Sequence, residues 1–383
     1  MIYLDNAATT YPKPQIVVEE MSKCIKSYCG NPGRSSHSLA LKSAEAIYNA
    51  RLELADFFGA DPESVVFTYN ATYALNIAIK SLIKPGFHVL ISDIEHNAVF
   101  RPIYSLSQRG LCTFDIFDTS GNDEDIIKSI ESKISSKTKM IVANFVSNIG
   151  SRKLPIKKIG NLCKKNDIIF ILDGSQGAGH YHINLKKMNI NALCLPGHKG
   201  LYGPQGTGVI IYNEIVPESY IEGGTGINSK DPKMPDFLPE IQEAGTLSTP
   251  AIVGLLEGLK WLKTLNIDKI RSHEEDLYNY FCTKMSNLED FILYRANLYP
   301  GNTICFNSRF ITSNYLASEL NKRGICVRSG FHCSPLAHKV FNTRDDGAVR
   351  VSFGVFNTRN DVIDLINALK EINCNNKKTG IYD

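Results

Sequence analysis

An aspartate and a lysine follow two apolar segments of this 383-residue chain. Residues 168–172 form a continuous apolar run, typical of a buried parallel strand, and the run ends at Asp173. A second run, 192–195, leads into a glycine-rich turn that carries Lys199. Open α/β sheets bind ligands at the carboxyl ends of their strands, so we expect both side chains at one site.

Such a pair suits pyridoxal-phosphate chemistry. Burial can lower the pKa of a lysine, which then forms a Schiff base readily. A carboxylate that faces a pyridine nitrogen keeps the ring protonated, and a protonated ring is an electron sink. The pattern therefore favours a pyridoxal-phosphate site. Local sequence leaves open the alternative that Asp173 caps the next segment and that Lys199 is solvated, because surface lysines are common.

Two more candidates follow predicted strands. Thr72 comes just after the strand 64–68, near the start of a predicted helix, where a hydroxyl and free N–H groups can bind a phosphate. The alternative is that Thr72 is an ordinary N-cap. His96 follows the strand 88–92 and could stack on a cofactor ring or serve as a structural hydrogen-bonding residue.

Cys333 stands apart from the other cysteines because it lies in a loop with glycine, serine and proline, next to a histidine and near Arg328. Nearby positive charge activates a thiol and a loop exposes it, so Cys333 is the candidate nucleophile; an incidental loop thiol is the alternative. Arg350 opens an apolar strand, where an unpaired charge is costly. Its partner is either a substrate carboxylate or an internal Asp or Glu.

Strands and helices alternate over most of the chain, which predicts a mostly parallel sheet between helices. We expect a large α/β domain at 15–250, and a small α+β domain at 1–14 and 251–383 that carries the cysteine loop. The last residues, 373–383, are polar and are expected to fray. The predicted helices are 15–28, 38–58, 156–165, 251–265, 268–285, 313–322 and 361–372, and the predicted strands are 64–68, 88–92, 140–143, 168–172, 192–195, 209–211, 304–306, 325–327 and 349–353.

Composition argues against several classes of protein. The net charge is +3 and basic clusters are short, so we expect no nucleic-acid partner. No apolar run approaches the roughly 20 residues that span a membrane, and the N-terminus does not resemble a signal peptide. The ten cysteines contain no CxxC pair, which argues against a zinc site or a disulfide framework. We therefore expect a cytoplasmic protein without a metal site.

Taken together and in order, these residues resemble the class V aminotransferase superfamily, and within it the cysteine desulfurases. The resemblance implies the fold-type-I pyridoxal-phosphate transferase architecture and a homodimer. The matching motifs cover nearly the whole chain: LDNAATT at 4–10, GNP at 30–32, EHN at 95–97, SN at 147–148, DGSQ at 173–176, GHK at 197–199, EAGT at 243–246, RSGFHC at 328–333 and RVS at 350–352.

The resemblance also implies individual roles. Lys199 forms the Schiff base and moves protons, Asp173 pairs with the pyridine nitrogen, and Gln176 pairs with the ring hydroxyl. Asn148 and Arg350 hold the substrate carboxylate, with Arg328 also in the substrate site. The catalytic residues it implies are Lys199, Cys333 and His96, and the residues it implies around pyridoxal 5'-phosphate are Ala71, Thr72, His96, Asp173, Gln176, His198, Lys199 and, from a neighbouring subunit, Thr225.

The implied reaction converts L-cysteine to L-alanine and leaves a persulfide on Cys333 for a sulfur-acceptor protein, in the supply of iron–sulfur clusters or thio-cofactors. Only 17 positions separate Cys333 from Arg350, which resembles the group with a short cysteine loop. Pro196 and Phe331 depart from the pattern, since relatives often have serine and histidine there. The alternatives are a selenocysteine lyase, a class V lyase or aminotransferase that does not use Cys333, and a non-catalytic scaffold.

Overall fold

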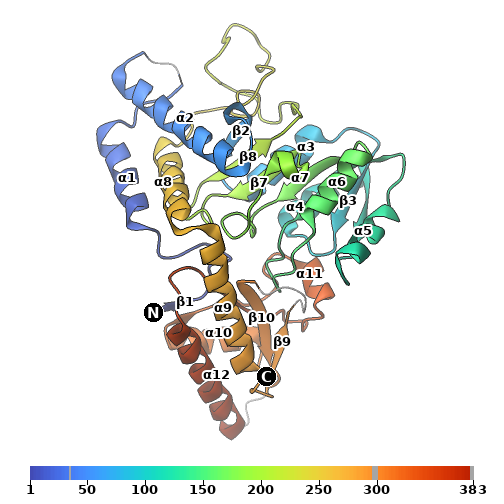
Figure 1. Cartoon of the computed structure of the whole chain (residues 1–383), viewed down its shortest axis with the longest axis vertical. Coiled ribbons are helices and arrows are strands. Elements are labelled where there is room, and N and C mark those ends of the chain that lie inside the picture. The colour runs from blue at the N-terminus through green and yellow to red at the C-terminus, as the bar shows by residue number, and fades with distance from the viewer. Residues whose placement is uncertain (34–35, 296–300, 380–383) are drawn as a thin grey trace.

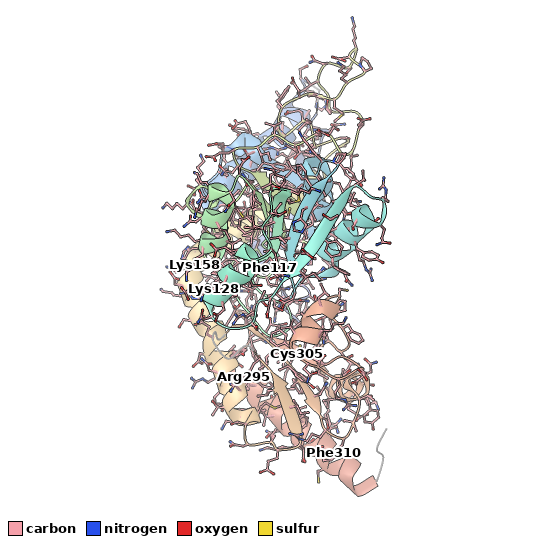
Figure 2. All side chains as sticks on the ribbon, turned by 90° about the vertical axis from the view of Figure 1, so that its right-hand side faces the viewer. Phe117, Lys128, Lys158, Arg295, Cys305 and Phe310 are labelled. Carbon is pink, nitrogen blue, oxygen red and sulfur yellow. The ribbon has the colours of Figure 1, made fainter. Side chains whose placement is uncertain are left out.

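The computed structural model describes residues 1–33, 36–295 and 301–379. The molecule has a large part built on a central sheet and a smaller part with the chain's C-terminal helix (Figure 1). Viewed from the side, Phe117 lies within the large part and Phe310 near the far end of the small part (Figure 2). Within the described residues, no helix is long and apolar enough to cross a membrane.

The central sheet has seven strands in the order β2-β8-β7-β6-β5-β3-β4. All neighbours pair in parallel except β8, which is antiparallel to both β7 and β2. The segment between β7 and β8 is a turn without a crossover helix, so the chain must reverse direction there. The strands are β2 (Val65–Thr68), β3 (Phe87–Ser92), β4 (Cys112–Phe117), β5 (Thr138–Asn144), β6 (Ile169–Asp173), β7 (Ala192–Pro196) and β8 (Gly208–Tyr212).

Helices cover both faces of this sheet because its strands are apolar on both sides. Alternate residues such as Ile141 and Met140 of β5 belong to two separate cores. One core includes α3 (Ala71–Leu82) and α4 (Asn97–Gln108). The other includes helices α2 (Ser38–Phe58), α5 (Asp123–Glu131), α6 (Ile156–Lys165), α7 (Leu185–Met188) and α8 (Thr249–Leu265).

The small part has its own apolar core, to which Leu4 contributes from the start of the chain. Strand β1 (Ile2–Tyr3) pairs in parallel with β11 (Ile325–Cys326), which joins the N-terminus to the small part. The expected division at residue 250 stays a prediction, and the apolar face of α8 packs in the large core. The remaining elements are α1 (Gln15–Ser27), the short η1 (Pro62–Ser64), α9 (Ile267–Met285), β9 (Phe291–Tyr294), β10 (Thr303–Ser308), α10 (Ser313–Lys322), α11 (Pro335–Val340), β12 (Val349–Ser352) and α12 (Arg359–Thr379), with β12, β10 and β9 forming an antiparallel sheet.

The predicted α/β fold with a mostly parallel sheet is confirmed, and α2, α6 and α10 have the predicted bounds. The sequence analysis missed β4, α4 and α5. The expected fraying of 373–383 is wrong as far as Thr379, because α12 continues to that residue; 380–383 lie outside the described residues. Asn373 is buried and donates a hydrogen bond to Asp290, which holds the helix beyond Ile372.

Candidate active site

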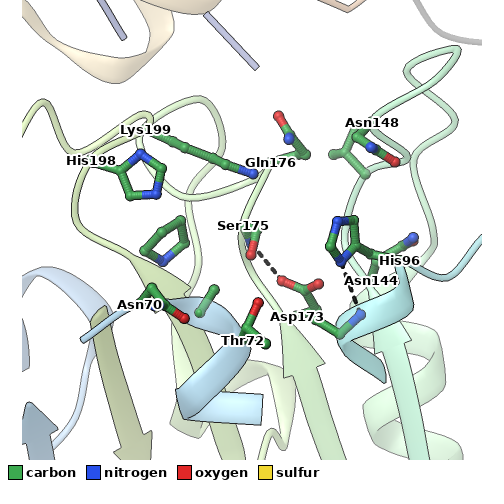
Figure 3. A pocket seen from close by; sticks show the side chains of 14 residues that line it. Asn70, Thr72, His96, Asn144, Asn148, Asp173, Ser175, Gln176, His198 and Lys199 are labelled. Atoms are coloured by element: carbon green, nitrogen blue, oxygen red, sulfur yellow. Dashed lines mark hydrogen bonds between the residues drawn. The ribbon is translucent and has the colours of Figure 1, made fainter. Parts of the chain in front are cut away.

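A pocket lies where the carboxyl ends of β5, β6 and β7 meet the N-termini of α3 and α4, as Figure 3 shows. Parallel strands bring their carboxyl ends to one edge of a sheet, so residues far apart in sequence converge there. The pocket is lined by most of the residues predicted to hold a cofactor or substrate, namely Ala71, Thr72, His96, Asn148, Asp173, Gln176, His198 and Lys199.

Asp173 ends β6 at the floor of the pocket, and only 4% of the residue is exposed. Its Oδ1 accepts a hydrogen bond of 2.9 Å from the Ser175 N–H. Burial raises the pKa of this carboxyl group, while the hydrogen bonds from Ser175 and the charge of Lys199 oppose that shift. A buried carboxyl of this kind is stabilised as an anion by a cationic partner, such as a protonated ring nitrogen.

Lys199 lies on the turn between β7 and β8, and its side chain extends across the pocket toward Gln176 (Figure 3). Gly197 N–H donates to the Thr207 carbonyl at 2.9 Å and Gly203 N–H donates back to the Gly197 carbonyl at 2.8 Å, which fixes the turn. Burial lowers the pKa of the Lys199 amine to about 8, against the attraction of Asp173. A substantial neutral fraction near neutral pH makes this amine nucleophilic.

The N-terminus of α3 forms one wall of the pocket. Asn70, not Thr72, is the N-cap, because its side chain accepts the Tyr73 N–H at 3.0 Å. The alternative reading of Thr72 as an ordinary cap is therefore wrong. Among the residues that the structure describes, the first N–H groups of the helix, those of Ala71 and Thr72, have no partner and can bind an anion in the pocket.

His198 lies beside this wall, and burial lowers its pKa to about 4. Within the described part of the chain, its Nδ1 is buried and has no hydrogen-bond partner. A buried polar atom without a partner is costly, so this nitrogen is suited to a ligand group in the pocket. Together with the α3 N-terminus, it is suited to hold a phosphate.

His96 is the N-cap of α4, and its Nδ1 accepts the Ala98 N–H at 3.0 Å. This bond requires an unprotonated Nδ1 and therefore places the proton of the neutral ring on Nε2. Burial lowers the pKa of His96 to about 3, and the charge of Lys199 acts in the same direction. The capping bond thus fixes a neutral ring and its tautomer at the pocket wall.

Lys13 supports the lysine turn, a contact that sequence analysis missed. Its Nζ donates to the His198 carbonyl and to the Thr10 hydroxyl, both at 2.7 Å. Burial lowers the pKa of Lys13 to about 7. Gln176 is held in a similar way, since its amide nitrogen donates to the Ala7 carbonyl at 2.9 Å. The N-terminal motif thus braces the pocket.

Glu95 is a second residue that sequence analysis missed as a separate feature, although it stands in the EHN motif. It is fully buried, and its Oε1 accepts hydrogen bonds from the Ser92 hydroxyl and the Asn144 N–H. Burial raises the pKa of Glu95 to about 8, and the negative charge of Asp173 adds to this rise. Glu95 is therefore a neutral acid near pH 7, which limits the negative charge around Asp173.

Arg350 is 1% exposed and pairs with an internal carboxylate, since its Nη2 lies 2.7 Å from Asp5 Oδ1. The structure thus contains the internal acid that the sequence analysis left open as an alternative. Nη1 donates to the Asn148 carbonyl at 3.4 Å. Among the described residues, Nε has no partner although it is buried. Asp5 therefore orients the guanidinium group and leaves one donor available for a second acceptor.

Asn148 lines the pocket, but its side chain also holds the cysteine loop. Its amide nitrogen donates to the His332 carbonyl at 3.0 Å, and its amide oxygen accepts from the Ser334 hydroxyl at 2.8 Å. Both ends of the amide are thus engaged on either side of Cys333. These two hydrogen bonds join the cysteine loop to the pocket wall. They were not part of the predicted role of Asn148, which was to hold the substrate carboxylate.

Cys333 is exposed, and its carbonyl accepts the Asn97 N–H at 2.7 Å. The cysteine loop is therefore joined to the first residue of α4, directly after His96. The Arg328 Nη2 lies 4.0 Å from the Cys333 Sγ. These contacts place an accessible thiol near a guanidinium group and attach its loop to the N-terminus of α4, although Cys333, Arg328 and Arg350 do not themselves line the pocket.

Thr225 is the predicted cofactor residue that the structure does not bring to the pocket of its own chain. It lies in the segment between β8 and α8, in a separate hollow that Tyr48 and Arg51 of α2 also line. That segment projects at the top of Figure 1. Its predicted action on a neighbouring subunit stays a prediction.

Comparisons with known proteins agree with this geometry. A family model described as aminotransferase class-V matches residues 2–365. A protein of Methanothermobacter thermautotrophicus named probable cysteine desulfurase is 29% identical over 384 residues, and the match covers 97% of this chain and 94% of that protein. The apo structure of a cysteine desulfurase from Thermococcus onnurineus NA1 has a TM-score of 0.89 at 29% identity, with 97% of this chain and 94% of that chain covered. A cysteine desulfurase structure from Escherichia coli has a TM-score of 0.86 at 23% identity, covers 96% and 94%, and shows likeness in fold alone.

The chain therefore belongs to the class-V aminotransferase family. Members of this family use pyridoxal phosphate. The pocket fits that group, because it offers a buried carboxyl at Asp173, an amine at Lys199, and an anion site at the α3 N-terminus with the unpartnered Nδ1 of His198.

Proposed function

We propose that this protein is a cysteine desulfurase that uses pyridoxal phosphate, converts L-cysteine to L-alanine and carries the released sulfur as a persulfide on Cys333. The observation that carries the proposal is the attachment of an exposed Cys333 to the wall of the Lys199 pocket, through the hydrogen bond between the Asn97 N–H and the Cys333 carbonyl. The names of the relatives support the same activity.

The cofactor, when bound, supplies an electron sink for charge that develops on the substrate carbons. In this proposal Lys199 would bind it covalently and move protons, Asp173 would pair with its ring nitrogen and Gln176 with its ring hydroxyl. The neutral His96 ring, with its proton on Nε2, would contact the cofactor ring. Ala71, Thr72 and His198 would hold its phosphate.

The substrate carboxylate binds Arg350, which Asp5 orients, and Arg328 adds a second positive charge near the reacting sulfur. Asn148 contributes to the substrate site from the wall and keeps the cysteine loop in place. In this arrangement the positive charge of Arg350 holds the substrate carboxylate, and the substrate sulfur faces the Cys333 thiol. Holding both groups in place lowers the entropy cost of the reaction.

The sulfur transfer balances without an added oxidant. The Cys333 sulfur attacks the sulfur of bound cysteine, and an S–S bond forms while the carbon–sulfur bond breaks. The carbon keeps the bonding electron pair and takes up the proton that the Cys333 thiol gave up, which yields alanine. The enzyme is left with a persulfide in place of its thiol.

We extend the proposal to the protein's setting. The short cysteine loop is held by hydrogen bonds on both sides of Cys333, so it cannot carry the persulfide far from the pocket. An acceptor protein must therefore approach the loop to take the sulfur. The acceptor would pass it on for iron–sulfur clusters or thio-cofactors. Placement of Thr225 outside its own pocket supports a homodimer in which this residue completes the partner's site. Ten cysteines with free thiols support a reducing cytoplasm.

The test is to measure alanine and sulfide release from L-cysteine with dithiothreitol present, for the wild type, Cys333→Ala and Lys199→Ala. We expect equal amounts of both products from the wild type and neither product from either variant. Cys374→Ala, which removes another exposed cysteine, is the control and should match the wild type.

Alanine release that persists in Cys333→Ala but not in Lys199→Ala would refute the role of Cys333 and indicate a lyase that uses Lys199 alone. A wild type that acts on selenocysteine but not on cysteine would replace the desulfurase with a selenocysteine lyase. A protein that binds no cofactor would indicate a scaffold.

A further inference from the structure

Two buried histidines lie behind the reactive cysteine, and the activity proposed above does not use them. His332 and His338 are each 3% exposed, and their rings are nearly parallel at 7° with centroids 5.4 Å apart. His332 Nδ1 lies 3.2 Å from His338 Nε2, and His338 Nδ1 lies 2.7 Å from the Thr343 hydroxyl. The other end of the chain of bonds is the Arg328 carbonyl, 3.3 Å from His332 Nε2.

The Arg328 carbonyl at this end determines which nitrogen of each histidine ring carries the proton. A carbonyl only accepts, so His332 Nε2 carries a proton and His332 Nδ1 is an acceptor. His338 Nε2 must then donate, which leaves His338 Nδ1 to accept from Thr343. Burial lowers the pKa of His332 to about 2 and that of His338 to about 4, so both rings are neutral. With one proton on each ring, every hydrogen bond from the Arg328 carbonyl to the Thr343 hydroxyl has one donor and one acceptor.

The backbone explains why this support is needed. His332 and Cys333 have φ of 51° and 57°, in the left-handed region that side chains other than glycine adopt rarely. The carbonyls of both residues accept hydrogen bonds, from Asn148 and Asn97 respectively. These bonds hold the two carbonyls of the loop. Of the two side chains, that of His332 is buried and that of Cys333 is exposed, so the His332 ring is the one that can anchor the loop to the interior.

Phe331 adds a packing contact to the pair. Its ring lies edge-on to His338, with centroids 5.3 Å apart, while 47% of Phe331 is exposed. The aromatic residue thus covers the pair from solvent. Helix α11 begins at Pro335 and its first turn returns His338, five residues after Cys333, to the His332 ring.

We propose that His338 is a positioning residue for Cys333: held by Thr343, it fixes the His332 ring and with it the left-handed backbone that presents the thiol to the pocket. The role of Cys333 as sulfur acceptor rests on the proposed function; the support of the loop does not. His338 contacts His332 and Phe331, the two residues that precede Cys333, so it acts on the thiol through them.

The experiment compares His338→Ala with His338→Gln in the complete, cofactor-loaded protein. Gln keeps a donor at the place of Nε2, whereas Ala removes it. For His338→Ala we expect kcat for alanine formation to fall by about 10- to 100-fold, with KM for cysteine within twofold, because the substrate binds before the thiol acts. His338→Gln should recover most of kcat. The control, His182→Ala, removes an exposed histidine of the large part and should behave as the wild type.

Hydrogen exchange gives a readout that does not need turnover. In His338→Ala, peptides with Asn97 and with residues 328–334 should exchange faster, while the α6 peptide should not change. Should His338→Ala fail to fold, Thr343→Val replaces the hydroxyl with a methyl group of similar size and should show the same exchange pattern more weakly. Wild-type kcat and wild-type exchange in these variants would overturn the proposal. A wild type that forms no alanine would instead refute the proposed function, and exchange would still decide the role of His338.

Discussion

Replacement of Asp5 by asparagine tests whether a single internal carboxylate stabilises the buried Arg350. The guanidinium group is 1% exposed and the Asp5 side chain 20% exposed, with 2.7 Å between Nη2 and Oδ1. Loss of one partner of a buried pair leaves an uncompensated charge, which typically costs 3–5 kcal/mol. Because Asp5 is partly exposed, we expect the free energy of unfolding to fall by about 3 kcal/mol.

Thermal unfolding followed by circular dichroism measures this loss. At about 2.1 cal/mol/K per residue, the unfolding entropy of 383 residues is about 0.8 kcal/mol/K, so a loss of about 3 kcal/mol lowers Tm by about 4 °C. The matched control is Asp276→Asn, which breaks an ion pair of the same 2.7 Å length between Arg359 and Asp276 at the surface. Exposed pairs contribute about 0–1 kcal/mol, so that variant should lose at most about 1 °C.

The same variant tests the substrate role of Arg350. Alanine, the expected product, carries a carboxylate that can replace the missing charge of Asp5. We therefore expect saturating alanine to raise Tm of Asp5→Asn more than Tm of the wild type. Equal Tm values for Asp5→Asn and Asp276→Asn would refute the electrostatic reasoning, and equal shifts with alanine would refute the substrate role.

Two further predictions concern stability. Glu95 has a folded-state pKa of about 8 against an ordinary value of 4.5, so the folded chain retains a proton that the unfolded chain loses as pH rises between these values. As pH rises from about 4.5 to about 8, the wild type should therefore lose stability relative to Glu95→Gln, by up to about 1.4 kcal/mol per pH unit. A stability difference between the two proteins that stays constant with pH in thermal unfolding would contradict this. Gly160→Ala in α6 would place a Cβ 1.8 Å from the Met188 carbonyl oxygen. Although alanine favours helices by about 1 kcal/mol relative to glycine, we expect a net loss of stability in thermal unfolding because of the clash. The control, Lys164→Ala at an exposed position of the same helix, should lose no stability. A Gly160→Ala variant as stable as the wild type would show that α6 and α7 separate at little cost.

The sequence by itself predicted most strands of the central sheet, several helices and the identity of the residues around the pocket, but not β4, α4 and α5. Hydrophobic periodicity and the positions of glycine are local properties, and they place Asp173 and Lys199 at strand ends without knowledge of any distant contact. The rule that ligands bind at the carboxyl ends of parallel strands then predicts their convergence. The polar composition of the end of α12 did not predict a helix there, because the buried Asn373 forms its hydrogen bond with Asp290, which is distant in sequence.

Only the tertiary structure decided which of several possible partners each polar group has. The carboxylate of Asp5 meets Arg350 across 345 positions, and Asn148 holds a loop 184 positions away. The tautomers of His96 and His332 follow from neighbours that a sequence does not place. These choices depend on distances of a few ångströms between separate elements, which packing sets and local patterns do not encode.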